Sequence, residues 1–226
     1  MSEAAINAMF FNASPRKNWN TAKMLQAALS GDVKNTFNMT SVDGDTSTND
    51  MAVILANGLA GNHEITEEGE AFTAFMTALN TVTVALCRMI AGDGEGATKL
   101  LECVVTGGKN QETAKTVARS VISSSLTKAA MFGEDANWGR ILCAIGYSGA
   151  DVDVQKIDVA FRSDAGEVVV CKDGAGVEFS EELAAKILHE TEIDILIDLK
   201  DGEAGATAWG CDLTHEYITI NADYRS

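Results

Sequence analysis

A polar stretch with three carboxylates and three hydroxyls lies between two apolar stretches of the chain. It runs from Val42 to Asp50 and reads VDGDTSTND. Side chains of this kind compete for backbone N–H groups, so they favour turns and helix caps over helix interiors. The apolar residues 51–55 follow at once, and we therefore expect a helix that starts near Asn49 or Asp50. A capped helix start needs no ligand, and on chemistry alone it is the favoured interpretation.

A metal site is not predicted from these residues. The calcium loop of an EF-hand requires glycine at its sixth position and glutamate at its twelfth. Counting from Asp43, those positions hold Thr48 and Ile54. The three histidines are scattered, so a zinc site or a Ser–His–Asp triad is not expected either. The five cysteines are far apart, share no metal-ligand spacing, and are expected to be small buried hydrophobes in a reducing compartment: Cys87, Cys103, Cys143, Cys171 and Cys211.

The composition is that of a soluble globular protein with a strong negative charge. The formal net charge is −16 over 226 residues, and 46% of the residues are hydrophobic. So acidic a chain does not suit nucleic-acid phosphate or anionic lipid. No basic segment precedes the first apolar one, and no apolar stretch is judged long enough to cross a membrane. We therefore expect a cytoplasmic protein that binds neither nucleic acid nor membrane.

The hydrophobic pattern predicts a mixture of helices and strands. Residues 67–90 are expected to form one long helix whose core-facing stripe includes Phe72, Val82 and Leu86. Further helices are predicted at 111–126, 141–147 and 181–190, and strands at 6–11, 99–105, 156–161, 167–170, 192–199, 206–213 and 216–220. Because the elements follow no regular βαβ repeat, the fold class is predicted to be α+β. Three segments are expected: an atypical strand–loop–helix segment at 1–31, a first α+β part at 32–150 and a second at 151–226.

Four stretches, in the same order along the chain, resemble the ornithine acetyltransferases of arginine biosynthesis, which are also called glutamate N-acetyltransferases. They are Phe37–Gly58, Ala91–Lys99, Met131–Arg140 and Trp209–Ser226. The resemblance covers about residues 37–226 and is to the β chain of that family. It implies an αββα layered sandwich and an α2β2 assembly with an α chain of the same enzyme.

The resemblance also implies a substrate site. In the family, a glutamate in the glycine-rich stretch contacts the amino-acid substrate, and this role falls on Glu95. The C-terminal tail of the family folds back into the active site, where an asparagine and a hydroxyl residue five positions later bind substrate. Asn221 and Ser226 have that spacing. No cofactor or metal is implied, although some members of the family use acetyl-CoA as the acetyl donor.

The catalytic residue cannot be assigned by this resemblance. In the family, the nucleophile is a threonine at the start of the β chain. Placing its first strand on Ile6–Phe11 puts Ala8 at that position, and a match on Asn20–Leu25 puts Lys23 there. Neither residue has a hydroxyl, and alanine cannot attack an acyl group. Ser2 could serve only if Met1 were removed.

The function implied is therefore acetyl transfer from N-acetylornithine to glutamate by a β-type chain that is expected to be inactive alone. The chemistry would be a ping-pong substitution through an acetyl-enzyme, stabilised by an oxyanion hole. Two alternatives stay open. One is a non-catalytic amino-acid-binding or scaffold chain of the same fold. The other is FMN binding through residues 12–21, because residues 8–30 resemble the opening of the flavodoxin-like NAD(P)H-dependent flavin reductases.

Overall fold

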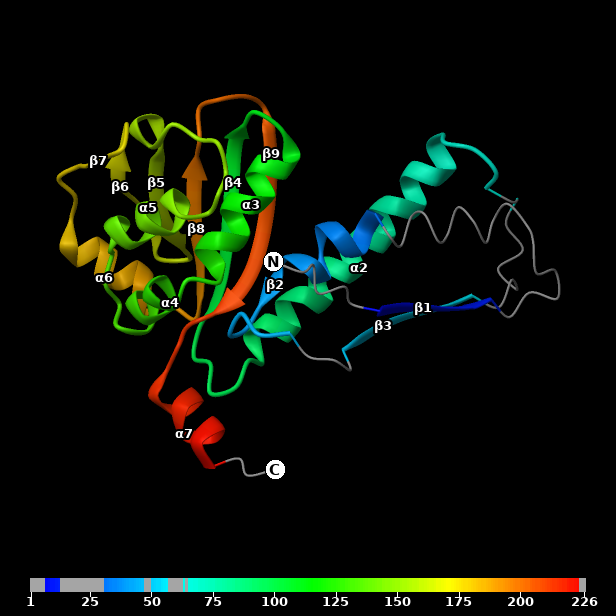
Figure 1. Ribbon diagram of the computed structural model, residues 1–226, viewed down its shortest axis with the longest axis horizontal. Helices are drawn as coiled ribbons and strands as arrows, with labels where there is room; N and C mark the ends of the chain where they lie inside the picture. Colours follow the sequence, from blue (N-terminus) through cyan, green and yellow to red (C-terminus); the bar gives the residue numbers. More distant parts are fainter. Residues whose placement is uncertain (1–6, 13–30, 47–49, 57–62, 64, 224–226) are drawn as a thin grey trace. The chain divides into compact units, whose positions relative to one another are not determined.

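A computed structural model describes residues 7–12, 31–46, 50–56, 63 and 65–223 (Figure 1). The chain divides into two compact units. The first unit comprises Met1–Asn38 and Thr46–Cys87, and the second comprises Met39–Asp45 and Arg88–Ser226. The segment boundaries expected from the sequence, after residues 31 and 150, stay predictions.

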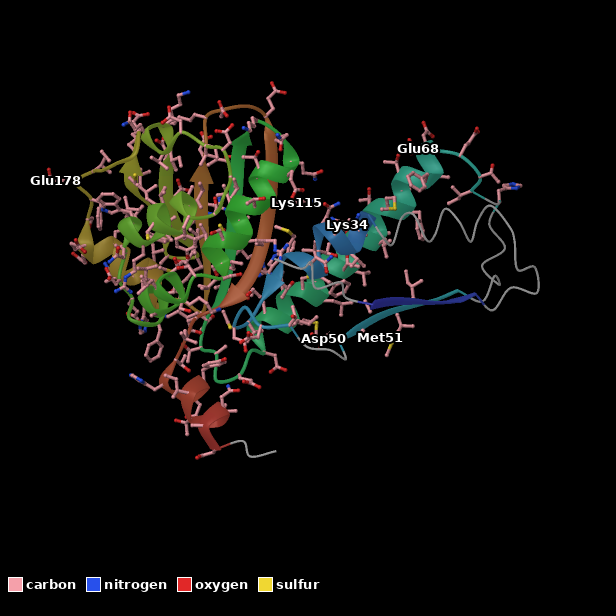
Figure 2. The ribbon with its side chains drawn as sticks, in the orientation of Figure 1. Lys34, Asp50, Met51, Glu68, Lys115 and Glu178 are labelled. Carbon is pink, nitrogen blue, oxygen red and sulfur yellow. The ribbon has the colours of Figure 1, made fainter. Side chains whose placement is uncertain are left out.

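The first unit contains a two-stranded parallel sheet. Strand β1 (Asn7–Asn12) pairs with β3 (Met51–Ala56), with Asn7 opposite Met51. The strand predicted at residues 6–11 is thus confirmed with a shift of one residue. The helix predicted from Asn49 or Asp50 is wrong, because Asp50 and Met51 lead into β3 (Figure 2). The run of apolar residues from Met51 includes β-branched Val53 and Ile54, which fit a strand better than a helix.

The long helix predicted at residues 67–90 is present as α2 (Glu70–Gly92). Its most buried side chains are Thr83, Cys87 and Ala91, which are spaced four residues apart and therefore share one face. Residues up to Cys87 belong to the first unit, and the last turn belongs to the second. In the second unit, Arg88 forms ion pairs with Glu102 and Glu192.

The core-facing stripe predicted for this helix is wrong at its C-terminal end. Val82 is 58% exposed and Leu86 is 41% exposed, and the apolar residues Met89 and Ile90 are exposed as well. Val82 and Leu86 each come one residue before a buried position of the helix, Thr83 and Cys87 respectively. The helix is also long and apolar enough, by length and composition alone, to cross a membrane, contrary to the expectation from the sequence. Only 17% of the apolar 18-residue stretch of this helix is buried.

The second unit is built on a seven-stranded sheet with the order β2-β9-β4-β8-β5-β6-β7. Parallel strands β4 and β8 lie at its centre, β9 runs antiparallel to β4, and β5 and β6 form an antiparallel pair. The strands are β2 (Thr40–Ser41), β4 (Leu100–Gly108), β5 (Asp158–Ser163), β6 (Gly166–Lys172), β7 (Ala175–Gly176), β8 (Glu192–Asp198) and β9 (Ala204–Cys211). The strands predicted at 156–161 and 167–170, and those predicted at 99–105, 192–199 and 206–213, are confirmed.

The core of the second unit lies between this sheet and a layer of helices (Figure 1). Alternate residues of β8, such as Ile193 and Ile195, lie opposite Leu101 and Cys103 of β4, and all four are at most 1% exposed. The helices of this unit are α3 (Gln111–Ile122), α4 (Ser125–Phe132), α5 (Trp138–Gly146), α6 (Glu181–His189) and α7 (His215–Asp223). Figure 2 shows side chains crowded among these helices and strands. The predicted α+β class is confirmed.

Three predictions for this unit are corrected. The helix expected at 111–126 is divided into α3 and α4, because the Ser124 side chain accepts the Thr127 N–H and begins a new helix. The strand expected at 216–220 is helix α7, whose first turn is closed by the Thr214 hydroxyl accepting the Tyr217 N–H. Cys143 is exposed, whereas the other four cysteines are buried as predicted.

The N-terminal cap of α6 provides a stability test. Ser180 Oγ accepts the Leu183 N–H at 3.2 Å, which satisfies one of the free donors at the helix start. Ser180→Ala is expected to lower the free energy of unfolding by about 1 kcal/mol. Ser180→Thr keeps the hydroxyl and should stay within about 0.5 kcal/mol of the wild type. Urea denaturation of both variants checks this, and an equal loss in the two would show that the cap hydrogen bond is not the cause.

Candidate functional site

Two of the three predicted substrate-binding residues are in direct contact. The Asn221 side-chain N–H donates to Glu95 Oε2 at 2.6 Å, although the residues are 126 positions apart in sequence. Asn221 also donates to the Tyr217 carbonyl oxygen at 2.9 Å, within α7. Both side chains are exposed, so this polar pair faces solvent. The third predicted residue, Ser226, lies outside the described residues.

The polar stretch near Asp43 meets the same helix. The Tyr217 hydroxyl donates to Asp43 Oδ2 at 3.0 Å. Desolvation raises the pKa of Tyr217, and the negative charges of Asp43 and Glu95 raise it further, so the phenol stays protonated and remains a donor. The carboxylates of Asp43 and Glu95 therefore both lie near the Tyr217 hydroxyl. A site of this kind attracts an ammonium group and repels phosphate.

The glycine-rich turn between α2 and β4, residues 93–99, explains how helix α7 comes so close to Glu95. Gly96 has a φ of +65°, a conformation that side-chain-bearing residues rarely adopt. A Cβ at Gly96 would lie 2.8 Å from Glu216 Cβ and 2.8 Å from the Tyr217 nitrogen. At Gly94, a Cβ would lie 2.8 Å from Cys211 Sγ. The absence of side chains at these two positions allows α7 and β9 to pack directly against the turn that carries Glu95.

A buried carboxylate ties this turn to the end of β9. Asp212 is 3% exposed, and its Oδ1 accepts the N–H groups of Thr98 at 2.8 Å and Lys99 at 3.0 Å. Its Oδ2 accepts the Thr98 hydroxyl at 2.5 Å. Two residues later, the Thr214 hydroxyl donates to the Gly96 carbonyl oxygen at 2.7 Å. The glycine-rich turn and the root of α7 are thus joined by several hydrogen bonds.

A buried lysine lies behind these residues. Lys128 of α4 is 2% exposed, and its ammonium donates to the Cys211 carbonyl oxygen. Burial lowers the pKa of Lys128, partly offset by the neighbouring Cys211, Asp212 and Asp43. Burial raises the pKa of the Cys211 thiol, so this sulfur is a protonated, inert group and not a nucleophile.

Sequence reasoning did not predict Lys128 or Asp212 as part of the site. One signal was available for the lysine, which is a charged residue within the otherwise uncharged helix SLTKAAMF. For Asp212 the signal was its place directly after a strand of small and apolar residues.

The candidate nucleophile positions belong to the first unit, whereas Glu95 and Asn221 belong to the second. Residue 8 lies in β1, where it is paired with Ala52, and it is an alanine. Ser2, Lys23 and residues 13–21 of the suggested flavin loop lie outside the described residues. Among the residues that the structure describes, no group of three or more His, Cys, Asp or Glu side chains could hold a metal ion.

Comparisons with known proteins agree with the resemblance found in the sequence. The profile of the ArgJ family matches residues 19–226. The chain is 51% identical over 206 residues to "Arginine biosynthesis bifunctional protein ArgJ 1" of Clostridium acetobutylicum, covering 91% of this chain and 50% of that protein. It is 48% identical over 204 residues to "Glutamate N-acetyltransferase" of Methanopyrus kandleri, covering 90% of this chain and 52% of that protein.

The fold is also that of a solved member. The crystal structure of arginine biosynthesis bifunctional protein ArgJ from Bacillus halodurans superposes with a TM-score of 0.84 at 42% sequence identity. That superposition covers 98% of this chain and 100% of the solved chain. The chain spans about half the length of the curated relatives it matches. On the profile, the sequence identity and the fold together, this chain belongs to the ArgJ family.

Proposed function

We propose that this chain is the β-type half of a glutamate N-acetyltransferase, the kind of enzyme that moves an acetyl group from N-acetylornithine to glutamate. For turnover it would need both an α-type half and a nucleophilic hydroxyl in place of Ala8. The observation that carries the proposal is the contact between Glu95 and Asn221 in a chain of the ArgJ family. Two residues from opposite ends of the second unit meet on an exposed, acidic surface, as an amino-acid site requires.

The chemistry of this surface suits an amino acid with a free ammonium group. A carboxylate such as Glu95 pairs with an ammonium group through a charge-assisted hydrogen bond. The Asn221 amide can donate to a substrate carboxylate, and a hydroxyl at Ser226 could do the same. Ornithine presents both an ammonium group and a carboxylate, so it fits this set of donors and acceptors. Acetyl-CoA is a possible alternative acetyl donor, and no other cofactor is proposed.

An α-type partner would supply what this chain lacks. The chain spans about half the length of the curated relatives it matches. The exposed apolar side chains of α2 suit coverage by such a partner: Val82, Leu86, Met89 and Ile90. We propose an α2β2 assembly in the cytoplasm. The ion pairs of Arg88 within α2 favour this over a membrane-spanning role for the helix, because a paired arginine next to a folded sheet does not suit lipid.

A second candidate function is favoured by the alanine at position 8. Alanine supplies no nucleophile, so a chain of this fold could bind ornithine or glutamate without turning it over. FMN binding through residues 12–21 is a weaker candidate, and it predicts a yellow protein with a flavin absorbance band. Colourless protein that is unaltered by added FMN would reject that idea.

The test measures ornithine release from N-acetylornithine with glutamate as the acceptor. The samples are the 226-residue chain, the chain mixed with the N-terminal half of the Clostridium relative, and the same mixture with an Ala8→Thr variant trimmed so that position 8 becomes the N-terminus. We expect release only from the last sample. Release from the unaltered chain would mean that another residue is the nucleophile, with Ser2 the first to replace. Ornithine binding without release in any sample would support the non-catalytic function. The absence of both ornithine binding and ornithine release in every sample would overturn the proposal.

A further inference from the structure

We infer that Asp212 is a positioning residue that sets the distance between Glu95 and Asn221. The inference rests on the proposed function of these two residues as substrate ligands. Asp212 touches neither of them. It acts through the glycine-rich turn on one side and through the root of α7 on the other.

The buried carboxylate connects the two segments where regular sheet pairing ends. The ladder between β4 and β9 has Leu100 opposite Cys211 as its last pair. Beyond it, the Asp212 N–H donates to the Lys99 carbonyl oxygen at 3.3 Å. The Asp212 side chain then accepts the three donors of Thr98 and Lys99 described above. Because both carboxylate oxygens are used, the orientation of the side chain is fixed relative to the turn.

The residues on either side of Asp212 are anchored to α4. Lys128 donates to the Cys211 carbonyl oxygen, and the Leu213 N–H donates to the Lys128 carbonyl oxygen at 3.3 Å. The backbone at Asp212 is therefore held against the helical layer by both neighbours. A shift of the glycine-rich turn away from β9 must break the hydrogen bonds to Asp212, since Asp212 itself cannot follow.

Asp212 is connected to both Glu95 and Asn221 through short stretches of chain and a few hydrogen bonds. Glu95 lies three residues before Thr98, in the same turn. Thr214 joins α7 to that turn through the Gly96 carbonyl oxygen, and it also closes the first turn of α7. Asn221 lies on the following turns of α7, a helix with no buried residue of its own. Its alignment with Glu95 therefore depends on how its root is held.

The experiment compares Asp212→Ala and Asp212→Asn with Asp158→Ala as the control. Asp158 also accepts a backbone N–H, from Asp173 at 2.9 Å, but it lies on β5, which β4 and β8 separate from β9. Hydrogen–deuterium exchange is followed in peptides covering residues 93–99 and 215–223, and ornithine affinity is measured by calorimetry.

For Asp212→Ala we expect faster exchange in both peptides and a Kd for ornithine raised about tenfold or more. Asp212→Asn keeps an oxygen for the two backbone donors and should restore the affinity to within about threefold of the wild type. Asp158→Ala should change neither quantity.

The outcomes separate this inference from the proposed function. If the wild-type chain binds no ornithine, the proposed function fails, while the exchange data still test the coupling of the two segments. If Asp212→Ala binds ornithine as the wild type does, or if exchange rises throughout the second unit, the positioning role is wrong. If Asp212→Ala does not fold, Thr98→Val removes the hydroxyl bonded to Oδ2 and is expected to accelerate exchange in the same two peptides. No acceleration in that variant would overturn the inference.

Discussion

Glu95→Gln will weaken ornithine binding by about 10- to 150-fold. A hydrogen bond to a charged group contributes roughly 1.5–3 kcal/mol, and this range corresponds to that loss in affinity. Glutamine has the same shape and can still accept the Asn221 hydrogen bond, so the contact that orders the site is kept while the charge is removed. Calorimetry with the purified chain measures the effect.

The matched control is Asp93→Asn on the same turn. Asp93 is also an exposed carboxylate, so its loss changes the net charge by the same amount. We expect its effect on affinity to be less than about twofold, since exposed charges that make no direct contact are screened by solvent and salt. Equal losses in the two variants would show that ornithine responds to the overall negative field and not to a specific glutamate.

Gly96→Ala will detach α7 from the turn and abolish most of the ligand affinity. The added methyl would collide with the Glu216 side chain and with the Tyr217 backbone. The positive φ would cost a further 1–2 kcal/mol or so. Because α7 has no buried residues, it can move away without disturbing the core, so the melting temperature should fall only slightly. Hydrogen–deuterium exchange in residues 215–223 and ornithine calorimetry measure the two effects.

Gly149→Ala separates the clash from the backbone strain. Gly149 also has a positive φ, of +79°, but a Cβ there would meet no atom within 4 Å. This variant should have the strain alone, with unchanged exchange in α7 and unchanged affinity. If both glycine variants lose affinity equally, the close packing of α7 on the turn does not explain the site.

The sequence predicted elements best where local chemistry and burial agree. For α6, predicted at residues 181–190, the apolar spacing agrees with the cap that Ser180 forms in the structure. In β8, the alternation of isoleucines matched the alternation of buried positions. In both cases the residue types that favour the local structure also face the core, so no long-range information was needed.

Two errors arose where one set of residue types fits two structures. The polar stretch before Met51 could end a turn that enters a strand as readily as it could cap a helix, and pairing with β1 decides for the strand. The β-branched residues between Glu216 and Ile220 favour a strand locally, but Ile218 is 62% exposed. Among the described residues, no strand pairs with this segment. The Thr214 cap and contact with Gly96 favour the helix instead.

The site was only partly predictable for a related reason. Glu95 and Asn221 were identified through family resemblance, and nothing in their spacing shows that they meet. The roles of Asp212 and Lys128 come from partners at least 83 positions away, which the local sequence does not encode. Their burial, more than their residue type, makes them important, because a buried charged group must be hydrogen-bonded.

The most direct test of the central claim follows the side-chain amide of Asn221 by NMR while ornithine is added to the ¹⁵N-labelled chain. Ornithine that binds Glu95 must replace or alter the hydrogen bond from Asn221, so the Asn221 side-chain signals should move in a saturable manner. The side-chain signals of Asn110 and Asn137, which cap α3 and α5, should stay in place. Unmoved Asn221 signals at saturating ornithine, or saturable changes confined to other residues, would contradict the assignment of this surface as the amino-acid site.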